Sequence, residues 1–557
     1  MTITIHRGIN QIGGCITEIA TDSTKIFIDL GRNLPKGDKP ANDPKANRKA
    51  IQELTEGVNA IFYTHYHGDH IDLYKYVPEN IPQYIGEVAK QVMVCKSKVL
   101  AGCSGIKDVT EEDVAKLEKV ETFIANEKVE IGDITVTPYF VSHSACDAYM
   151  FLIESNIGES VLHTGDFREH GYLGGGLEKI LKAFIVGKEI DVLITEGTML
   201  SRPQEKVKHE NDLKMEAKEL MTKYKNVFVM CSSTDIDRLA TFHAANKEIK
   251  KQKPFVCDDY QLDILDIFSK TSGKETSLFN FKAYPFFEKN QKLIDWILDK
   301  GCCMLVRATE KFEKYWDLLK PQLNMQETVL IYSMWSEYIN PNSRYAKQDY
   351  LNFVSKFPRI EKLHTSGHAS AETLAKVCEL VNPQEAIIPI HSEHSSDFSK
   401  LNISDKLKEK MITDSTFEII KMRQLKTKST LTEEEKKHRE GHLEKFLESL
   451  RDEPEMTHEE HWERLKSEFK QRTGLKEGAH VRYKGISDKD RESPLYRMYW
   501  RGTHPNPNKI LDLETIYEIE HIEIYGTGTV VKLVGFGDET FLGGLFEPID
   551  RNESINN

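Results

Sequence analysis

Three histidines and one aspartate lie within six residues near the start of the chain, in residues 64–72. They follow an apolar run that is typical of a buried strand. His65 and His67 are two residues apart, so in extended backbone their side chains face the same point, whereas Asp69 and His70 come after a turn and face a second point. Imidazole and carboxylate are ligands for zinc or manganese, and two pairs of them predict two ions. The alternative is a polar loop that is rich in histidine by chance. The density of the cluster argues against this alternative.

Composition limits the kind of protein that carries this cluster. The chain has 557 residues, 39% of them hydrophobic and 29% charged, which predicts a globular protein of two or three domains. Nine cysteines without CxxC spacing, no membrane-spanning apolar run and no signal-peptide pattern predict a cytoplasmic protein without a membrane partner. The formal net charge of −13 excludes a polycation that wraps nucleic acid, so a nucleic-acid substrate requires a local groove or the metals.

Further candidate ligands follow other apolar strands. Five separate strands end in His, Asp or Glu, and we expect them to line one edge of a single sheet. The downstream residues at these strand ends are His143, Asp166, Glu196 and His391. A carboxylate such as Asp166 bridges two cations in many two-metal sites. Asp29, at the end of the strand that begins at residue 25, is expected to orient a ligand histidine from behind.

Helices and apolar strands alternate between about residue 191 and residue 360. This alternation predicts a second layered α/β unit with a parallel sheet, inserted between the fourth and fifth ligand-bearing strands. Ser232 and Ser233 follow one of its strands and precede a helix, where hydroxyls and backbone amides accept a phosphate. Helix capping is the alternative role for these two residues.

The last part of the chain has a different character. Residues 430–473 are dense in charge and carry apolar stripes at helical spacing, which predicts a helical segment. From residue 475 onward, short strand patterns separated by turns predict a small SH3-like barrel. Its tyrosine, tryptophan and arginine residues are compatible with single-stranded nucleic acid binding or with a core and its rim. The function of residues 426–557 therefore stays open.

Residues 1–415 resemble the β-CASP group of metallo-β-lactamase-fold nucleases, and most closely its ribonuclease J branch. Seven motifs carry the resemblance: Asp29; the HxHxDH motif of residues 65–70; His143; Asp166; Glu196; His368 in Ser-Gly-His-Ala; and His391. The resemblance implies an α/β fold, a metallo-β-lactamase αββα sandwich with an inserted β-CASP α/β domain. The expected domains are 1–198 and 359–425 for the sandwich, 199–358 for the insert, 426–474 for the helical segment and 475–550 for the SH3-like barrel.

The resemblance also implies how the site works. One divalent ion is expected at His65, His67 and His143, and a second at Asp69, His70 and His391, with Asp166 between them; zinc is the expected ion and manganese the alternative. Asp69, Glu196 and His368 are expected to act in catalysis. The expected substrate-binding residues are Ser232, Ser233, His364, Ser366 and His368.

The resemblance predicts a metal-dependent ribonuclease that hydrolyses RNA phosphodiester bonds with a two-metal-activated hydroxide. In this group a histidine at the position of His391 accompanies RNA-acting members, and valine accompanies DNA-acting members. Residues 333–338 lack the Pro-Gly-Asn pattern of ribonuclease J, and residues 231–234 are a variant of its phosphate loop, so endonuclease and 5′-exonuclease modes both stay open. The alternatives are a small-molecule metallo-hydrolase (thioester, lactone or phosphodiester) and a metal-bearing RNA-binding scaffold. RNA is the expected partner; the natural transcript and the oligomeric state, a homo-oligomer included, stay open.

Overall fold

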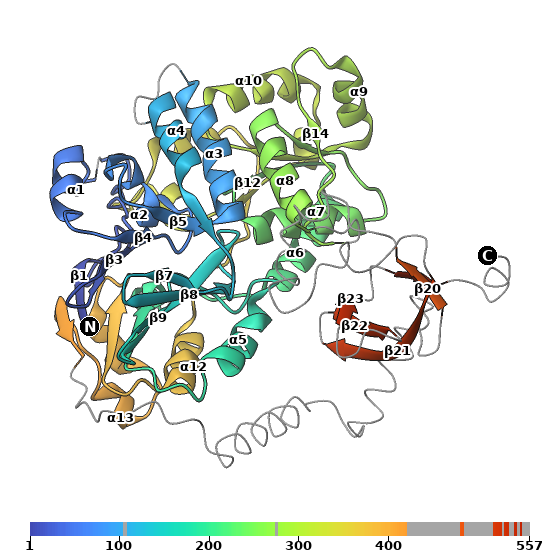
Figure 1. The fold of residues 1–557 in the computed structure, drawn as a ribbon. Coiled ribbons are helices and arrows are strands. Elements are labelled where there is room, and N and C mark those ends of the chain that lie inside the picture. The colour runs from blue at the N-terminus through green and yellow to red at the C-terminus, as the bar shows by residue number, and fades with distance from the viewer. Residues whose placement is uncertain are drawn as a thin grey trace. The chain divides into compact units, whose positions relative to one another are not determined.

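The computed structural model describes residues 1–39, 41–103, 109–272 and 277–419, and five strands between residues 480 and 548 (Figure 1). The chain divides into two units, Met1–Lys421 and Met422–Asn557. Each unit is described by itself.

Two sheets form the centre of the first unit. The first has seven strands in the order β19 (Thr416–Glu418), β1 (Thr2–Arg7), β2 (Ile16–Ala20), β3 (Lys25–Ile28), β4 (Ala60–Phe62), β5 (Gln83–Gly86) and β6 (Glu121–Phe123). The second has six strands in the order β18 (Ala386–Ile390), β11 (Val192–Glu196), β10 (Ser160–His163), β9 (Ala148–Ser155), β8 (Ile134–Val141) and β7 (Val129–Ile131). Both are mixed sheets, with parallel pairs from β3 to β6 and from β18 to β10.

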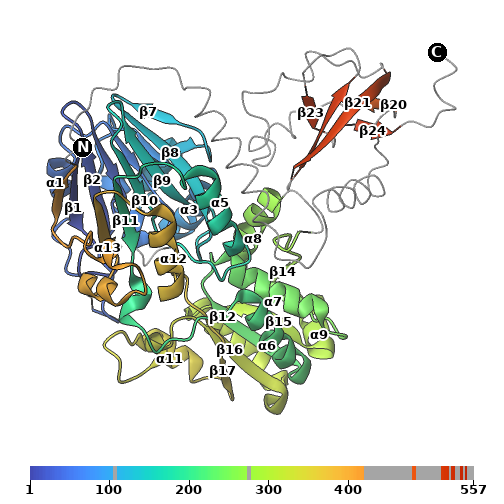
Figure 2. The same cartoon turned by 90° about the horizontal axis from the view of Figure 1, so that it is seen from below.

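The two sheets pack face to face, and alternating side chains build the interior between them. Ile26 and Ile28 of β3 and Val192 and Ile194 of β11 belong to one shared buried cluster. Phe27, between the two isoleucines, belongs instead to the cluster on the other face of its sheet. Side chains in a strand point alternately to the two faces, so each sheet is buried on both sides. Figure 2 shows the strands of the two sheets as adjacent layers.

Helices cover the outer faces of this sandwich. Residues of α3 (Glu87–Ala101) and α4 (Glu111–Lys119) share the cluster on the outer face of the first sheet. On the outer face of the second sheet, α5 (Leu177–Phe184) and α12 (Ala371–Val381) pack side by side (Figure 1). The order of layers is therefore helix, sheet, sheet, helix. The shorter helices of this part are α1 (Arg48–Leu54), α2 (Gly68–Ile71) and α13 (Asp405–Lys408).

A third sheet confirms the predicted parallel α/β unit. Its six strands are all parallel, in the order β14 (Tyr284–Pro285), β13 (Phe255–Cys257), β15 (Cys302–Val306), β12 (Asn226–Cys231), β16 (Thr328–Ser333) and β17 (Ile360–Lys362). Its helices are α6 (Glu210–Lys223), α7 (Ile236–Glu248), α8 (Asp259–Ser272), α9 (Gln291–Lys300), α10 (Glu310–Leu319) and α11 (Gln348–Val354). The sheet runs past residue 358, since β17 pairs with β16.

Single 3₁₀ turns complete the first unit: η1 (Tyr74–Tyr76), η2 (Gly174–Gly176), η3 (Thr198–Ser201), η4 (Lys320–Gln322), η5 (Met325–Glu327), η6 (Ser336–Ile339) and η7 (Ser395–Lys400). Across the described part of the chain, no helix combines the length and the hydropathy that a membrane span requires.

The second unit contains an antiparallel sheet. Its strands are β23 (Thr540–Leu542), β22 (Gly528–Leu533), β21 (Ile516–Tyr525), β20 (His480–Tyr483) and β24 (Phe546–Pro548), in that order. The predicted short strands are therefore confirmed, whereas the SH3-like barrel stays a prediction. The predicted helical segment of residues 430–473 lies outside the described residues.

The prediction that all the ligand-bearing strands share one sheet edge is wrong. Residues 64–72 follow β4 of the first sheet. In the second sheet, Glu196 is the last residue of β11, and β8, β10 and β18 are followed by His143, Asp166 and His391. His368 follows β17 of the third sheet. An apolar pattern marks where a strand stops but not which strand it pairs with, so it does not distinguish one sheet from three.

Candidate metal centre

Seven side chains converge where the ends of the two sandwiched sheets meet, and together they form what we call the metal centre: His65, His67, Asp69, His70, His143, Asp166 and His391. The first group within it contains three histidines. His65 Nε2 lies 3.0 Å from His67 Nδ1, which lies 3.2 Å from His143 Nε2. Ligand atoms around a tetrahedral zinc at 2.0–2.1 Å are separated by about 3.3 Å, so this spacing is that of atoms sharing one ion.

The second group contains two histidines and two carboxylates. Asp69 Oδ2 lies 3.2 Å from His391 Nε2 and 4.0 Å from His70 Nε2. Asp166 Oδ2 lies 3.2 Å from His70 Nε2, 3.6 Å from His391 Nε2 and 4.0 Å from His65 Nε2. Asp166 therefore reaches histidines of both groups, and its place between two ions stays a prediction.

Asp29 holds two of these histidines from behind. Its Oδ2 accepts a hydrogen bond of 2.7 Å from His70 Nδ1. The Thr64 hydroxyl donates to the same carboxylate at 2.9 Å and lies 3.0 Å from His65 Nδ1. With Nδ1 protonated in this way, each ring leaves Nε2 as a lone pair directed into the centre. Asp29 thus contacts a candidate ligand histidine, as the sequence predicts.

The other two ring orientations come from distant parts of the chain. His143 Nδ1 donates to the Gly367 carbonyl oxygen at 2.7 Å, and His391 Nδ1 lies 2.6 Å from Thr198 Oγ1. Thr198 also donates to the His391 carbonyl at 3.2 Å, which leaves its oxygen lone pairs for the ring. Each of the two Nε2 atoms is again free to face the other candidate ligands.

The backbone beneath the centre is closely packed. A Cβ atom on Gly31, after β3, would lie 1.6 Å from the Asp69 carbonyl oxygen. No other residue therefore fits at this position without moving residues 64–72, which we call the ligand loop. Asp29 has a φ of 61° and His391 a φ of 50°. Positive φ values cost energy in residues other than glycine and concentrate at functional sites.

The protonation behaviour of the group fits divalent cations. Burial and neighbouring histidines hold the pKa of His65 and His143 well below the ordinary value, and burial lowers the pKa of His67 to about 4, so all three are neutral. Despite burial, neighbouring histidines keep the pKa of Asp69 and Asp166 below the ordinary value, so both are ionised.

His70 gives the most specific test of the fit. Its Nε2 is buried and makes no hydrogen bond within the described structure, although Asp166 is close. Burial lowers its pKa, but Asp166 and Asp29 outweigh burial and raise it, so this position stabilises positive charge. A cation between His70 Nε2 and the carboxylates supplies that charge and a partner for the orphaned nitrogen. The residues present therefore fit divalent metal ions.

His368 and Glu196 lie beside the metal centre. Glu196 Oε2 lies 3.1 Å from His368 Nδ1 and accepts from the Thr198 amide at 3.2 Å, and Oε1 accepts from the Ala369 amide at 3.1 Å. Burial disfavours charge on His368, but the carboxylates of Glu196 and Asp166 outweigh this and raise its pKa. The side chain of His368 is 20% exposed, whereas Glu196 is fully buried. A donor whose charged form is favoured by two carboxylates, and which has an accessible edge, thus adjoins the centre.

The predicted substrate-binding residues are less closely grouped. Ser366 is buried; its hydroxyl accepts from the His368 amide at 3.1 Å. His364 Nδ1 accepts from Arg238 Nη1 at 3.1 Å, and burial with Arg238 lowers its pKa to about 3. Ser232 is exposed, and Ser233 Oγ accepts from Arg307 at 3.4 Å. Of this set, only His368 contacts residues of the metal centre among the interactions of the described residues, and Ser366 contacts His368.

Sequence reasoning did not assign roles to several residues around the centre. Thr198 orients His391, Cys15 lies beside His70 and His391, and Arg168 holds the Ser366 carbonyl at 3.1 Å. Thr198 and Arg168 each lie two residues beyond a motif carboxylate, which is the only signal that points to them.

Comparisons with known proteins agree with this geometry. Residues 358–412, which contain His368 and His391, match the family model described as Zn-dependent metallo-hydrolase RNA specificity domain. Ribonuclease J of Mycoplasma pneumoniae is 25% identical over 422 residues, covering 72% of this chain and 69% of that protein. Ribonuclease J of Mycoplasma genitalium is 22% identical over 417 residues, with the same two shares.

A crystal structure of a protein of unknown function from Enterococcus faecalis has a similar fold. Its TM-score is 0.53 at 20% identity, over 70% of this chain and 94% of that chain. The likeness at this identity concerns the fold alone.

Proposed function

We propose that this chain, which is ribonuclease J-like, is a metal-dependent ribonuclease that hydrolyses phosphodiester bonds of RNA. The observation that carries the proposal is the convergence of the seven residues of the metal centre with the His368–Glu196 pair at their side. The match to an RNA specificity domain spans two of these histidines and supports RNA as the substrate. The architecture that accompanies this function is a metallo-β-lactamase sandwich with a β-CASP insert, followed by an SH3-like barrel.

We assign two divalent ions, zinc in both positions, to the metal centre. His65, His67 and His143 would hold one ion, and Asp69, His70 and His391 the other, with Asp166 touching both. When bound, such cations supply hydroxide at neutral pH, because they lower the pKa of water from 15.7 to about 7, and they neutralise charge on the phosphate. The short distances within each group of ligand atoms support this allocation.

His368 acts on the phosphate from the accessible side of the centre. With Nδ1 committed to Glu196, Nε2 is the nitrogen that donates a hydrogen bond or a proton to a non-bridging or leaving oxygen. Glu196 keeps the ring charged and oriented, and is itself held by three backbone amides. Asp69 orients the attacking group, while its carboxylate stays ionised.

Ser232, Ser233, His364 and Ser366 remain our proposed contacts to the RNA backbone. Ser233 lies at a strand end with Arg307 beside it, a combination of hydroxyl and guanidinium that suits a phosphate. All nine cysteines are free, which supports a cytoplasmic location.

The test is cleavage of end-labelled single-stranded RNA by the purified chain loaded with zinc or with manganese. We expect cleavage that a chelator abolishes and added metal restores, and the ladder of products distinguishes endonucleolytic from 5′-exonucleolytic action. Asp166→Ala should lose both metal and cleavage, whereas His394→Ala, an exposed histidine near His391, should keep both. Hydrolysis of a thioester or lactone reporter without cleavage of RNA would overturn the proposal.

A further inference from the structure

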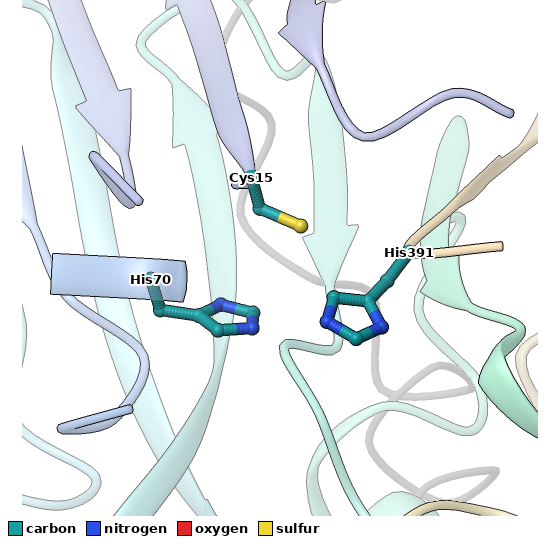
Figure 3. A group of neighbouring side chains, drawn as sticks. All are labelled: Cys15, His70 and His391. Atoms are coloured by element: carbon teal, nitrogen blue, oxygen red, sulfur yellow. The ribbon is translucent and has the colours of Figure 1, made fainter. Parts of the chain in front are cut away.

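The side chain of Cys15 points toward the second group of the metal centre, the one with two histidines and two carboxylates. Figure 3 shows its sulfur between the rings of His70 and His391. One ligand atom from each of these three residues lies within 4.8 Å of the other two. Cys15 is 1% exposed and follows the glycine turn before β2. No motif of the chain assigns a function to it.

The backbone holds Cys15 in register with the ligand loop. Its amide donates to the Asp69 carbonyl oxygen at 3.0 Å, and its own carbonyl accepts from the Gly31 amide at 3.0 Å. Gly8 lies beside the thiol at the base of His391: a Cβ atom on it would lie 3.5 Å from the Cys15 sulfur, an ordinary van der Waals distance. The sulfur is therefore positioned by the same contacts that position Asp69.

Ring nitrogens of His70 and His391 face the same space as the Cys15 sulfur. His70 and His391 both have Nδ1 engaged, by Asp29 and Thr198, so both present Nε2 to the space that Cys15 faces. His70 Nε2 is buried and lacks a hydrogen-bond partner in the described structure. The Cys15 sulfur and His70 Nε2 are both lone-pair donors that face the same space, and a cation between them would serve as a partner for both.

We propose that Cys15 is a sulfur ligand of the ion held by Asp69, His70 and His391, an inference that rests on the metal centre of the proposed function. On binding, the S–H bond breaks, the proton leaves to water, and a sulfur lone pair forms the bond to the ion, with no change of oxidation state. Thiolate is a soft donor that favours zinc over manganese and magnesium. Cys15 thus makes this half of the centre selective for thiophilic ions.

X-ray absorption at the zinc edge of the full-length, zinc-reconstituted chain tests the assignment. We expect a zinc–sulfur distance of about 2.3 Å beside the zinc–nitrogen and zinc–oxygen distances of about 2.0–2.1 Å. Cys15→Ala and Cys15→Ser should lose the sulfur shell. Cys378→Ala, which removes a buried cysteine of α12 outside the metal centre, should keep it. Absence of sulfur scattering from the wild-type protein with two zinc ions bound would overturn the proposal, and so would its persistence in Cys15→Ala.

Metal affinity gives a second readout that needs no RNA. Cys15→Ala should weaken binding of cadmium, a thiophilic probe, by at least the ~10-fold that loss of an outer-sphere partner costs, with a much smaller effect on manganese. Equal losses for both metals would indicate a packing role and contradict the assignment. Wild-type protein that cleaves RNA without a sulfur ligand would refute this inference alone. A sulfur ligand in a protein that does not cleave RNA would refute the proposed function alone.

Discussion

At the scale of single residues, hydrogen bonds to the ring nitrogens orient the candidate ligand histidines. Asp29 orients two of these histidines, His70 and His65. It accepts from His70 directly and from Thr64, which in turn contacts His65. Asp29→Asn keeps a residue type that tolerates the positive φ of this position, but it removes the charge that holds the two rings. We expect the variant to bind zinc ~10–100-fold more weakly, measured by competition with a chromophoric chelator. Asp22→Asn, at an exposed turn, should match the wild type; equal affinity of Asp29→Asn would contradict the role.

His368 is not among the seven residues that we propose as metal ligands, which separates its proposed role from metal binding. We expect His368→Ala to retain about two metal ions per chain and to lower turnover on RNA by ~10²-fold or more, because a positioned proton donor is lost. Glu196→Gln should shift the pH at which turnover depends on the histidine toward lower values, since the carboxylate raises the pKa of His368. Metal analysis together with cleavage rates measures both effects. Unchanged turnover of His368→Ala would exclude the catalytic assignment.

At the scale of elements, the loop after β10, helices α6 and α7, and the segment after β17 are joined by a buried ionic cluster. Arg168, fully buried, lies 2.8 Å from Asp237 and 3.3 Å from Glu210, and Glu210 lies 3.1 Å from Arg238. Arg168 also donates to the Ser366 carbonyl, two residues before His368. The cluster therefore connects the insert to the segment that carries Gly367 and His368.

Removing Arg168 from this cluster should leave Asp237 buried without its ion-pair partner, whereas Glu210 keeps Arg238. We expect Arg168→Met to lower the free energy of unfolding by ~3–5 kcal/mol, measured by urea denaturation. The double variant Arg168→Met/Asp237→Leu should lose less than the sum of the two single variants, because it removes charges of both signs. Strictly additive losses would show that the two residues do not act as a pair.

At the scale of the whole molecule, the insert contributes a pH dependence that is separate from the metal centre. His243, in α7, accepts from the Lys282 amide and packs between Phe255 and Phe281; burial lowers its pKa from 6.5 to about 4. As the pH falls below 6.5, His243 binds a proton in the unfolded chain before it does so in the folded chain. The free energy of unfolding therefore decreases between pH 6.5 and pH 4, and this histidine causes no further decrease below pH 4. The difference corresponds to about 3 kcal/mol at most.

The measurement is the free energy of unfolding of wild type and His243→Gln between pH 7.5 and pH 4. The stability difference between the two proteins should shrink as the pH falls, because only the wild type has the buried histidine. His394→Gln should follow the wild-type profile. Parallel profiles for wild type and His243→Gln would contradict the prediction.

The sequence reveals the candidate metal-ligating residues more readily than it reveals how they are arranged in the folded molecule. Each ligand type stands directly after an apolar strand, and such a pattern is local, so residues such as His143 and His391 are visible without a structure. Their distribution over two sheets is not, because pairing depends on contacts between residues far apart in the chain. The positions of Cys15 and Thr198 likewise depend on contacts between residues far apart in the chain. Only the folded structure shows that each of them lies beside His391.

The ligands of the metal centre span the chain from His65 to His391, with the third sheet formed in between. During synthesis at about 5–20 residues per second, tens of seconds separate the appearance of the first ligand from that of the last. His65, His67 and His143 have all been synthesised once residue 143 has emerged, but Gly367, whose carbonyl orients His143, and His391 follow the insert. Neither group of the proposed centre is therefore complete before the insert has been synthesised, so under our metal assignment a fully loaded centre marks a chain whose insert has already been made.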